Sequence, residues 1–345
     1  MPNRSWKPPV PRSLTTQILL SAGVAAVIVW RVPFGSLRAA FRNLQYGSLL
    51  TAIACFLVLL FLRAYKWHRL MGAVGTGHLR KSLRSLFGGF ALGLITPGRL
   101  GELGRCVFVR EEDRAQVALL TLLDRMLDLW ALLTLVGVSL FFLVPHPVAI
   151  FGVAVWLALL PLVMSFPRLI ARLSRLMRKS WHYHGHMAEA AKGLHGVKIP
   201  IFAILAVVAG WTELASFFFL LRAFFPAEYT TAVATFPYIV LAGDLPLSFS
   251  GVGVREGAAA LLLSPYSVPS GAAVDASLLW FVFAILLPAT FGSVWLLVEK
   301  SQSRRRKADS APAHADPVPK HESLPHHPAP PGERAPAAPS QGPLG

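Results

Sequence analysis

The stretch FGGFALGLITPGRLGELGRCVF, from Phe87 to Phe108, decides how the rest of the chain is interpreted. It begins as an apolar helix, is interrupted by Pro97 and by glycines, and continues with arginine and glutamate. A second stretch, YIVLAGDLPLSFSGVGVREGAAALLL from Tyr238 to Leu263, repeats this pattern. A broken helix at membrane depth is tolerated only inside protein or against a water-filled cavity, because lipid cannot satisfy the freed backbone groups. A matched pair of broken helices indicates a transport site near the bilayer midplane.

The composition also indicates a membrane protein. Of 345 residues, 54% are hydrophobic and 14% are charged, and the mean hydropathy is +0.54. Soluble domains carry about 25% charged residues. The net charge of +16 does not indicate nucleic-acid binding, because most Lys and Arg lie between apolar segments, where they set topology and meet anionic headgroups. Cys55 and Cys106 have neither the spacing of a zinc site nor that of a disulfide framework.

Apolar runs predict the membrane spans. A helix needs about 20 residues to cross a hydrocarbon core of roughly 30 Å. Six runs are long enough or nearly so: Thr15–Trp30, Gly47–Arg63, Gln116–Val144, Val148–Phe166, Ile199–Leu221 and Asp275–Val298. The broken elements, about 86–108 and 236–263, follow the second and the fifth run. The predicted fold class is therefore an all-α integral membrane protein with about six full transmembrane helices plus two broken or re-entrant elements.

The distribution of Lys and Arg predicts the orientation. Four segments are strongly basic: the N-terminal tail, the loops after the second and the fourth run, and the segment after the last run. If the six spans alternate in direction, all four lie on one side, which is then the cytoplasmic side of the plasma (inner) membrane. Both termini are then cytoplasmic, and the broken elements enter from opposite sides as an inverted repeat. The loop after the second run is expected to hold Lys66, Arg69, Arg80, Lys81 and Arg84.

The same pattern divides the chain into three regions. Residues 1–14 are predicted to form a cytoplasmic N-terminal tail, and residues 15–300 the polytopic membrane domain. Residues 301–345 are rich in Pro, Ala and His and lack an apolar face, so we expect a disordered cytoplasmic tail.

Ionisable residues inside the predicted spans are the first candidates for a site, because such groups are costly in a membrane. Asp124 and Asp128 share one face of a helix, and Arg125 can pair with Asp128. This cluster is either a self-neutralised pair that locks helices together or part of a cavity wall. Glu213 lies mid-span without a local partner and must be protonated, hydrated or paired across helices; Asp244 lies in the second broken segment.

The two breaks supply the other candidates. Thr96 and Pro97 predict an N-cap and first position of a half-helix, whose free N–H groups can bind phosphate or carboxylate. Ser248 or Ser250 is the predicted cap in the second break. The glycines either allow close approach of a ligand or serve only helix packing. The remaining residues of the candidate substrate-binding site are Gly98, Arg99, Gly101, Glu102, Arg105, Gly251, Gly253, Arg255 and Glu256.

Other chemistry is not predicted. His182, His184 and His186 lie in WHYHGHM without a carboxylate or cysteine at ligand spacing, so we interpret them as part of a solvated loop. We expect no metal, no cofactor and no catalytic residues. The chain lacks a GxxxxGK[ST] motif, which argues against direct use of ATP.

Four motifs carry a resemblance to a known family: RAYKWHRLM, GLITPGRLGELGR, LLDRMLD and SGVGVREGAAALL, in this order. Over roughly residues 15–300 the chain resembles the lysylphosphatidylglycerol synthase transmembrane-region family, the flippase-like membrane proteins. The resemblance implies movement of lipids with large polar heads. Some relatives are fused to an aminoacyl-transferase domain that makes lysyl-phosphatidylglycerol, and one is described as a dolichol-linked glycosyltransferase. The short tail here leaves room for neither domain, so we expect the translocating part alone.

The predicted function is therefore translocation of a polar-headed lipid across the plasma membrane, through a groove between the broken helices. The expected partners are membrane lipids with polar or phosphate-containing headgroups, and a homo-oligomer is compatible with the sequence. Arg99 and Arg255 are expected to hold the phosphate. Two alternatives remain open: a membrane enzyme that transfers a sugar or aminoacyl group to a lipid, and a non-catalytic membrane partner protein.

Overall fold

The described structure, a computed structural model, is entirely helical. It describes residues 44–94, 96, 99–143, 145–165, 194, 197–246 and 250–309, and within these ranges there is no strand. The predicted first span Thr15–Trp30, the N-terminal tail, the histidine motif and the chain beyond residue 309 lie outside the described residues. Two compact units are distinguished, Met1–Lys300 and Ser301–Gly345, and the helices that carry the candidate site belong to the first.

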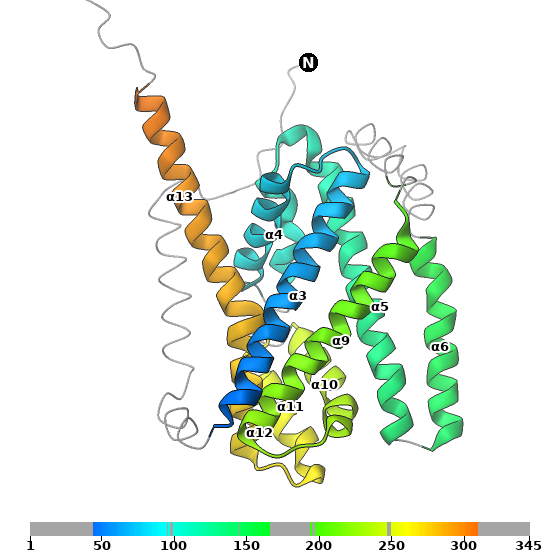
Figure 1. Cartoon of the computed structure of the whole chain (residues 1–345). Coiled ribbons are helices and arrows are strands. Elements are labelled where there is room, and N and C mark those ends of the chain that lie inside the picture. Colours follow the sequence, from blue (N-terminus) through cyan, green and yellow to red (C-terminus); the bar gives the residue numbers. More distant parts are fainter. Residues whose placement is uncertain are drawn as a thin grey trace, which may run out of the picture. The chain divides into compact units, whose positions relative to one another are not determined.

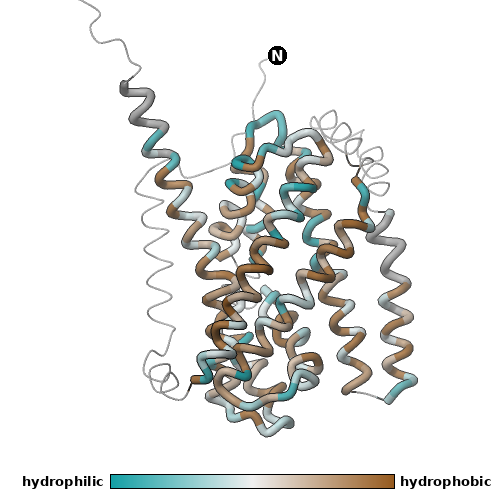
Figure 2. The backbone as a smooth tube through the Cα atoms, in the orientation of Figure 1, coloured by the Kyte–Doolittle hydropathy of each residue, from teal (hydrophilic) through white to brown (hydrophobic). Residues whose placement is uncertain are grey.

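Four helical segments are long and apolar enough to cross a membrane, as judged from the described part of the chain: Tyr46–Ala73, Glu111–Leu143, Ile199–Phe224 and Ser270–Glu299. Apolar residues dominate along these segments, as Figure 2 shows. They match the second, third, fifth and sixth predicted runs. The fourth run forms a helix that packs against the third. The elements in chain order are α3 (Tyr46–Ala73), α4 (Leu79–Leu94), η2 (Leu100–Phe108), η3 (Glu111–Asp113), α5 (Arg114–Leu143), α6 (His146–Met164), α9 (Ile199–Phe224), α10 (Tyr229–Asp244), α11 (Val254–Leu263), η6 (Ser264–Tyr266), α12 (Ser270–Phe281), η7 (Val282–Leu286) and α13 (Leu287–Asp309).

Both predicted breaks are present, and each joins two short helices into a hairpin. In the first hairpin α4 packs against η2, and in the second α10 packs against α11. Figure 1 shows α4 toward one end of the bundle and α10 and α11 toward the other. The two turns meet, because the Ser250 N–H donates a hydrogen bond to the Thr96 carbonyl oxygen at 3.4 Å. The interruptions thus lie against each other, where protein groups satisfy part of the freed backbone.

The predicted cap of the first half-helix is wrong. The returning helix η2 begins at Leu100, and its N-cap is Arg99, which has the left-handed backbone angles φ 59° and ψ 21°. Thr96 instead closes the turn from outside the helix, since its hydroxyl accepts a hydrogen bond from the Gly101 N–H at 2.6 Å. η2 is a nine-residue 3-10 helix, whereas this conformation usually runs for only three or four residues.

The second half-helix is capped by a different residue from the one predicted. α11 follows Gly253, which has a φ of 89°. The Glu256 carboxylate reaches back and accepts the Gly253 N–H at 2.5 Å, which satisfies one of the free donors at the helix start. Ser250 is buried and its hydroxyl caps nothing in the described chain, and Ser248 lies outside the described residues.

The helix α3 extends beyond the predicted span, which changes the place of several charged residues. It continues to Ala73, so Lys66 and Arg69 belong to the helix, where Lys66 is buried, and the prediction that they lie in a loop is wrong. Arg80, Lys81 and Arg84 likewise belong to α4. The predicted span ends at Arg63, where the basic residues begin, whereas the helix continues for ten more residues to Ala73.

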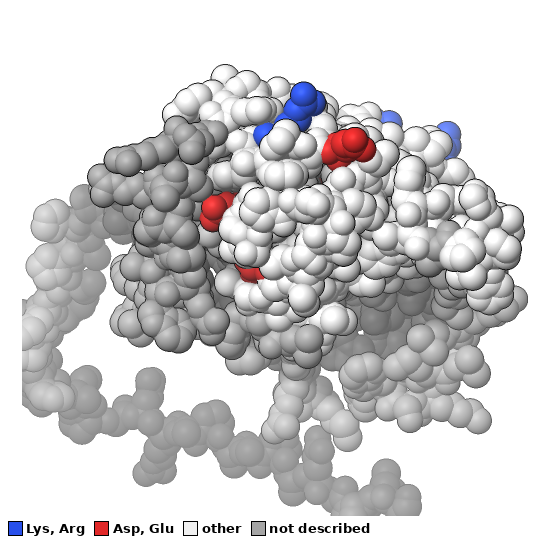
Figure 3. Space-filling model, turned by 90° about the horizontal axis from the view of Figure 1, so that it is seen from below, with Lys and Arg blue, Asp and Glu red and all other residues white. Residues whose placement is uncertain are grey.

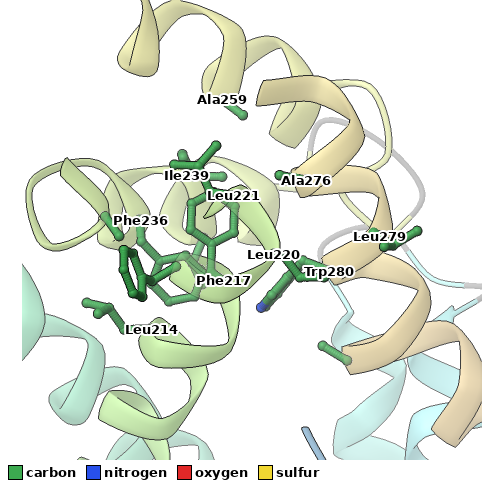
Figure 4. Close-up of a cluster of buried hydrophobic side chains, with 14 of the residues drawn as sticks. Leu214, Phe217, Leu220, Leu221, Phe236, Ile239, Ala259, Ala276, Leu279 and Trp280 are labelled. Carbon is green, nitrogen blue, oxygen red and sulfur yellow. The ribbon is translucent and has the colours of Figure 1, made fainter. Parts of the chain in front are cut away.

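Apolar clusters hold the two hairpins. Around the second hairpin, the ring of Phe217 of α9 lies tilted against that of Phe236 of α10, with centroids 4.9 Å apart, and the Phe236 ring centroid lies 5.9 Å from that of Trp280 of α12 (Figure 4). A separate cluster around the first hairpin includes the fully buried Trp67 of α3 and Leu120 of α5. Each hairpin is therefore fixed by the long helices beside it.

Close backbone contact at the second turn requires glycine at position 251. Gly251 has a φ of +77°, and a Cβ there would lie 2.3 Å from the Gly243 carbonyl oxygen. Gly257, on the following helix, has nothing within 4 Å of its Cβ position.

We expect Gly251→Ala to destabilise the protein by about 1–3 kcal/mol, because both the backbone angle and the contact are unfavourable. Gly257→Ala is the matched control and should be neutral or slightly stabilising, since alanine is favoured over glycine inside a helix. Thermal unfolding of the purified protein in detergent measures both. Equal melting temperatures for the two variants would show that the turn does not constrain the fold.

Candidate functional site

A network of buried charges joins α3, η2 and α5. Lys66, Glu102, Arg105 and Asp124 are each no more than 2% exposed. Charges this deeply buried are tolerated only when they are paired and hydrogen-bonded. The network contains four cations and three carboxylates, in ion pairs of 4 Å or less: Lys66, Arg99, Arg105 and Arg125 with Glu102, Asp124 and Asp128.

Lys66 links α3 to α5. Its ammonium Nζ lies 2.9 Å from Asp124 Oδ1 and also contacts Asp128. Asp124 and Asp128 lie four residues apart on one face of α5, so a single ammonium group can contact both carboxylates. Sequence reasoning missed Lys66, although RAYK places it three residues after Arg63, on the same face of a continuing helix.

Arg105 links η2 to the same aspartate. Its Nη1 donates to Asp124 Oδ2 at 2.7 Å, and its Nη2 lies 3.4 Å from Glu102 Oε2. The guanidinium also lies over the Trp67 ring, 4.6 Å from its centroid, a cation–π contact that is stronger away from water. Gly89 leaves room for this side chain, since a Cβ there would lie 2.5 Å from Arg105 Cγ.

Glu102 joins the first hairpin to α5 through ion pairs with arginines of both. Arg125 lies 3.1 Å from Glu102 Oε2, and Arg99 contacts Glu102 Oε1. The predicted pair of Arg125 and Asp128 is confirmed at 3.1 Å, but it is one edge of the larger network. Arg125 and Asp128 therefore both link neighbouring helices and line the cavity.

Glu213 of α9 has the cross-helix partner that its position required. Both of its carboxylate oxygens lie 2.9 Å from Arg63 Nη2 of α3. The two side chains are 13% and 16% exposed, so the pair is only partly buried. Arg63 is the second residue that sequence reasoning missed.

The network faces a cavity of about 390 Å³ between the first hairpin, α5, α9 and α10. Six of its lining residues are charged, three arginines and three carboxylates: Arg63, Arg99, Arg125, Asp128, Glu213 and Asp244. The rest of the lining is apolar and includes Leu100, Leu103, Leu122, Leu129 and Phe236. Three members of the network do not line the cavity: Glu102, Arg105 and Asp124. They stabilise, through ion pairs, the positions of the arginines that do line it.

Arg255 repeats, in the second hairpin, the arrangement of Arg105. It is 1% exposed and lies over the Trp280 ring, 4.7 Å from its centroid. It donates to the Ser250 carbonyl oxygen at 3.0 Å, but no described carboxylate lies within 4.0 Å of it. Arg255 is not among the residues that line the cavity. The arrangement therefore brings Arg99, but not Arg255, to the cavity wall.

The remaining predicted residues have local roles or cannot be placed. Gly101 packs against the Leu92 carbonyl oxygen, 2.2 Å from where its Cβ would be. Gly253 and Glu256 form the start of α11. Pro97 and Gly98 lie outside the described residues.

Comparison with known families shows a match over most of the chain. The model of the family described as "Lysylphosphatidylglycerol synthase TM region" matches residues 15–292, which is most of the chain and confirms the resemblance seen in the motifs. Comparison with curated proteins and with solved structures found no match.

We expect Lys66→Met to destabilise the protein by about 3–5 kcal/mol, because it removes a cation from the buried Asp124 carboxylate. Lys81→Met is the control with the same change of side chain. Lys81 pairs with Asp113 where both side chains are 22% exposed, and partly solvated pairs contribute about 0–1 kcal/mol. Thermal unfolding in detergent compares the two variants. If Lys66→Met costs no more than Lys81→Met, the buried network does not stabilise the fold.

Proposed function

Since the chain belongs to the lysylphosphatidylglycerol synthase transmembrane-region family, we propose that it is a translocase for a polar-headed lipid. The headgroup passes through the cavity beside the two turns, while the acyl or prenyl tails remain in the bilayer. One observation carries the proposal: the cavity combines six charged side chains with apolar residues that are exposed at its edge.

The charged wall suits a lipid headgroup. Arg99 and Arg125 offer planar guanidinium groups, which bind phosphate oxygens through paired hydrogen bonds. Arg125 is 28% exposed while it is held by Glu102 and Asp128, so part of its fork is free to meet a ligand. Asp128, Glu213 and Asp244 can contact cationic or hydroxyl groups of the head.

The apolar edge suits lipid tails. Leu100, Leu103 and Leu129 line the cavity and are 59%, 41% and 51% exposed. Such a patch is unfavourable in water and is expected at a surface that meets membrane. A lipid can therefore keep its tails beside these leucines as its headgroup crosses, which avoids burying the tails in a polar passage.

The proposed architecture is six spans with the two hairpins as an inverted repeat. Three features support the repeat: the hairpins lie toward opposite ends, their turns meet, and each carries a buried arginine over a tryptophan. Such a repeat lets alternate sides open around one fixed site.

The proposed location is the plasma membrane with both termini cytoplasmic. The end that carries α10 to α12 has few Lys and Arg on its visible face, as Figure 3 shows. Arg80, Lys81 and Arg84 lie at the start of α4, toward the opposite end. This asymmetry follows the rule that basic residues stay on the cytoplasmic side.

We expect Arg99→Gln and Arg125→Gln each to slow lipid movement about ten-fold or more in liposomes, because a charge-assisted contact of about 1.5–3 kcal/mol is lost. Arg125→Lys should restore little, because an ammonium group lacks the planar fork. The control is Arg222→Gln, which removes an exposed arginine at the far end of α9. Transbilayer movement of labelled lipids across a panel of headgroups measures the rates.

Normal movement in the Arg99→Gln/Arg125→Gln double variant would contradict the proposal. Chemical conversion of the lipid, rather than movement, would favour the alternative of a membrane transferase. Neither movement nor conversion would favour a non-catalytic partner protein.

For the topology, we expect Ala73→Cys to react from the cytoplasmic side and Ser270→Cys from outside. The two residues end α3 and begin α12, and a Cys55→Ser/Cys106→Ser background removes the native thiols. Labelling of intact cells with an impermeant maleimide should therefore modify Ser270→Cys alone. Labelling of Ala73→Cys from outside would invert the orientation.

A further inference from the structure

A second cavity, of about 820 Å³, lies at the end of the molecule where α4 and α5 begin. It shares no lining residue with the cavity beside the two turns. Its walls come from the first turns of α4, the end of η2, the η3 turn and Glu299 of α13. The lining residues are His78, Arg80, Lys81, Arg84, Val107, Phe108, Val109, Arg110, Glu112, Asp113, Arg114 and Glu299.

The charges of this cavity do not balance. Five Lys and Arg residues line it, against three carboxylates. Lys81 pairs with Asp113, and Arg114 pairs at 3.2 Å with Glu111, which is not part of the lining. Arg110 is exposed and makes no ion pair with a described residue. Glu112 makes no ion pair with a described residue either, so the lining carries two more positive than negative charges, and Glu111 neutralises one of them.

Glu299 occupies the position that a bound anion would take. Its carboxylate lies 3.1 Å from Arg80 and 3.4 Å from Arg84, so two guanidinium groups from one face of α4 converge on it. Glu299 is only 19% exposed, whereas Arg80 and Arg84 are 68% and 45% exposed. The two arginines are therefore already positioned to bind oxygen atoms and remain accessible from solvent.

The cavity also lies at the ends of two apolar spans. One apolar span begins at Glu111, and another ends at Glu299. Charged residues are expected near the ends of apolar spans, where the chain meets water and headgroups, and Glu299 lines the cavity itself. Basic pockets between helices at this level on the cytoplasmic side bind phosphate-bearing headgroups.

We propose that this cavity is a binding site for a phosphate group, distinct from the transport cavity. The phosphate oxygens are bound by Arg80, Arg84 and Arg110. The phosphate replaces the Glu299 carboxylate as the ion-pair partner of Arg80 and Arg84. An anionic phospholipid and a soluble phosphate ester both carry the required group. Because binding requires no lipid movement, a failure of the translocase proposal would not contradict this site, and the reverse is also true.

The test measures ligand-dependent melting of the full-length protein in a neutral detergent. Three short probes separate the sources: dioctanoyl phosphatidic acid carries phosphate and chains, glycerol 3-phosphate carries phosphate alone, and dioctanoyl glycerol carries chains alone. We expect saturable stabilisation by dioctanoyl phosphatidic acid and none by dioctanoyl glycerol. Saturation by glycerol 3-phosphate as well would support the site with a soluble source, and equal stabilisation by all three probes would overturn it.

Variants locate the binding. Arg84→Gln/Arg110→Gln should raise the half-saturating concentration about ten-fold or more, because two cations near the phosphate are lost. Arg69→Gln/Arg222→Gln makes the same change of charge away from the cavity and should leave that concentration unchanged. Equal values for the two double variants would overturn the proposal.

Glu299→Gln gives a test in the opposite direction that does not depend on the double variant folding. It removes the competing carboxylate and should lower the half-saturating concentration about three-fold or more. An unchanged or higher value would overturn the proposal.

Discussion

The fold depends on pairing Glu102 and Asp124, two carboxylates with almost no exposure to solvent. A buried carboxylate costs several kcal/mol unless cations and hydrogen bonds compensate it. Three arginines surround Glu102, while Lys66 and Arg105 contact Asp124. Because these cations come from α3, η2 and α5, the pairing requires all three elements to meet at one place.

This requirement explains the form of the break. Gly93 is one of the glycines that let η2 return along α4, because the Glu102 Cγ would lie 2.6 Å from a Cβ at that position. Arg99, in the turn, then lines the cavity, and its ion pair with the buried Glu102 fixes its position. The buried charged residues thus position the charged residues of the cavity wall. This supports the proposal that Arg99 and Arg125 act together on a headgroup.

Sequence reasoning identified the apolar spans and both breaks, since these follow from local patterns of hydrophobicity, proline and glycine. It missed Arg63 and Lys66 because a count of basic residues ended the span at the first cation, although ion-pair partners on α5 and α9 allow the helix to continue. The contact of Arg255 with Trp280 could not be predicted, because it joins segments whose packing no local pattern specifies. The caps were wrong for a related reason: a left-handed Arg99 and the reaching carboxylate of Glu256 close the turns.

The central claim is that a lipid headgroup enters the cavity between the hairpins. Crosslinking with a phospholipid that carries a photoreactive diazirine on its headgroup, followed by peptide mapping, tests it most directly. The account predicts labelling of the cavity segment of α5, around Met126 and Leu129, and loss of this labelling when unlabelled lipid competes. Labelling confined to outward-facing positions such as Leu57 and Phe151, with none in the cavity, would contradict the account.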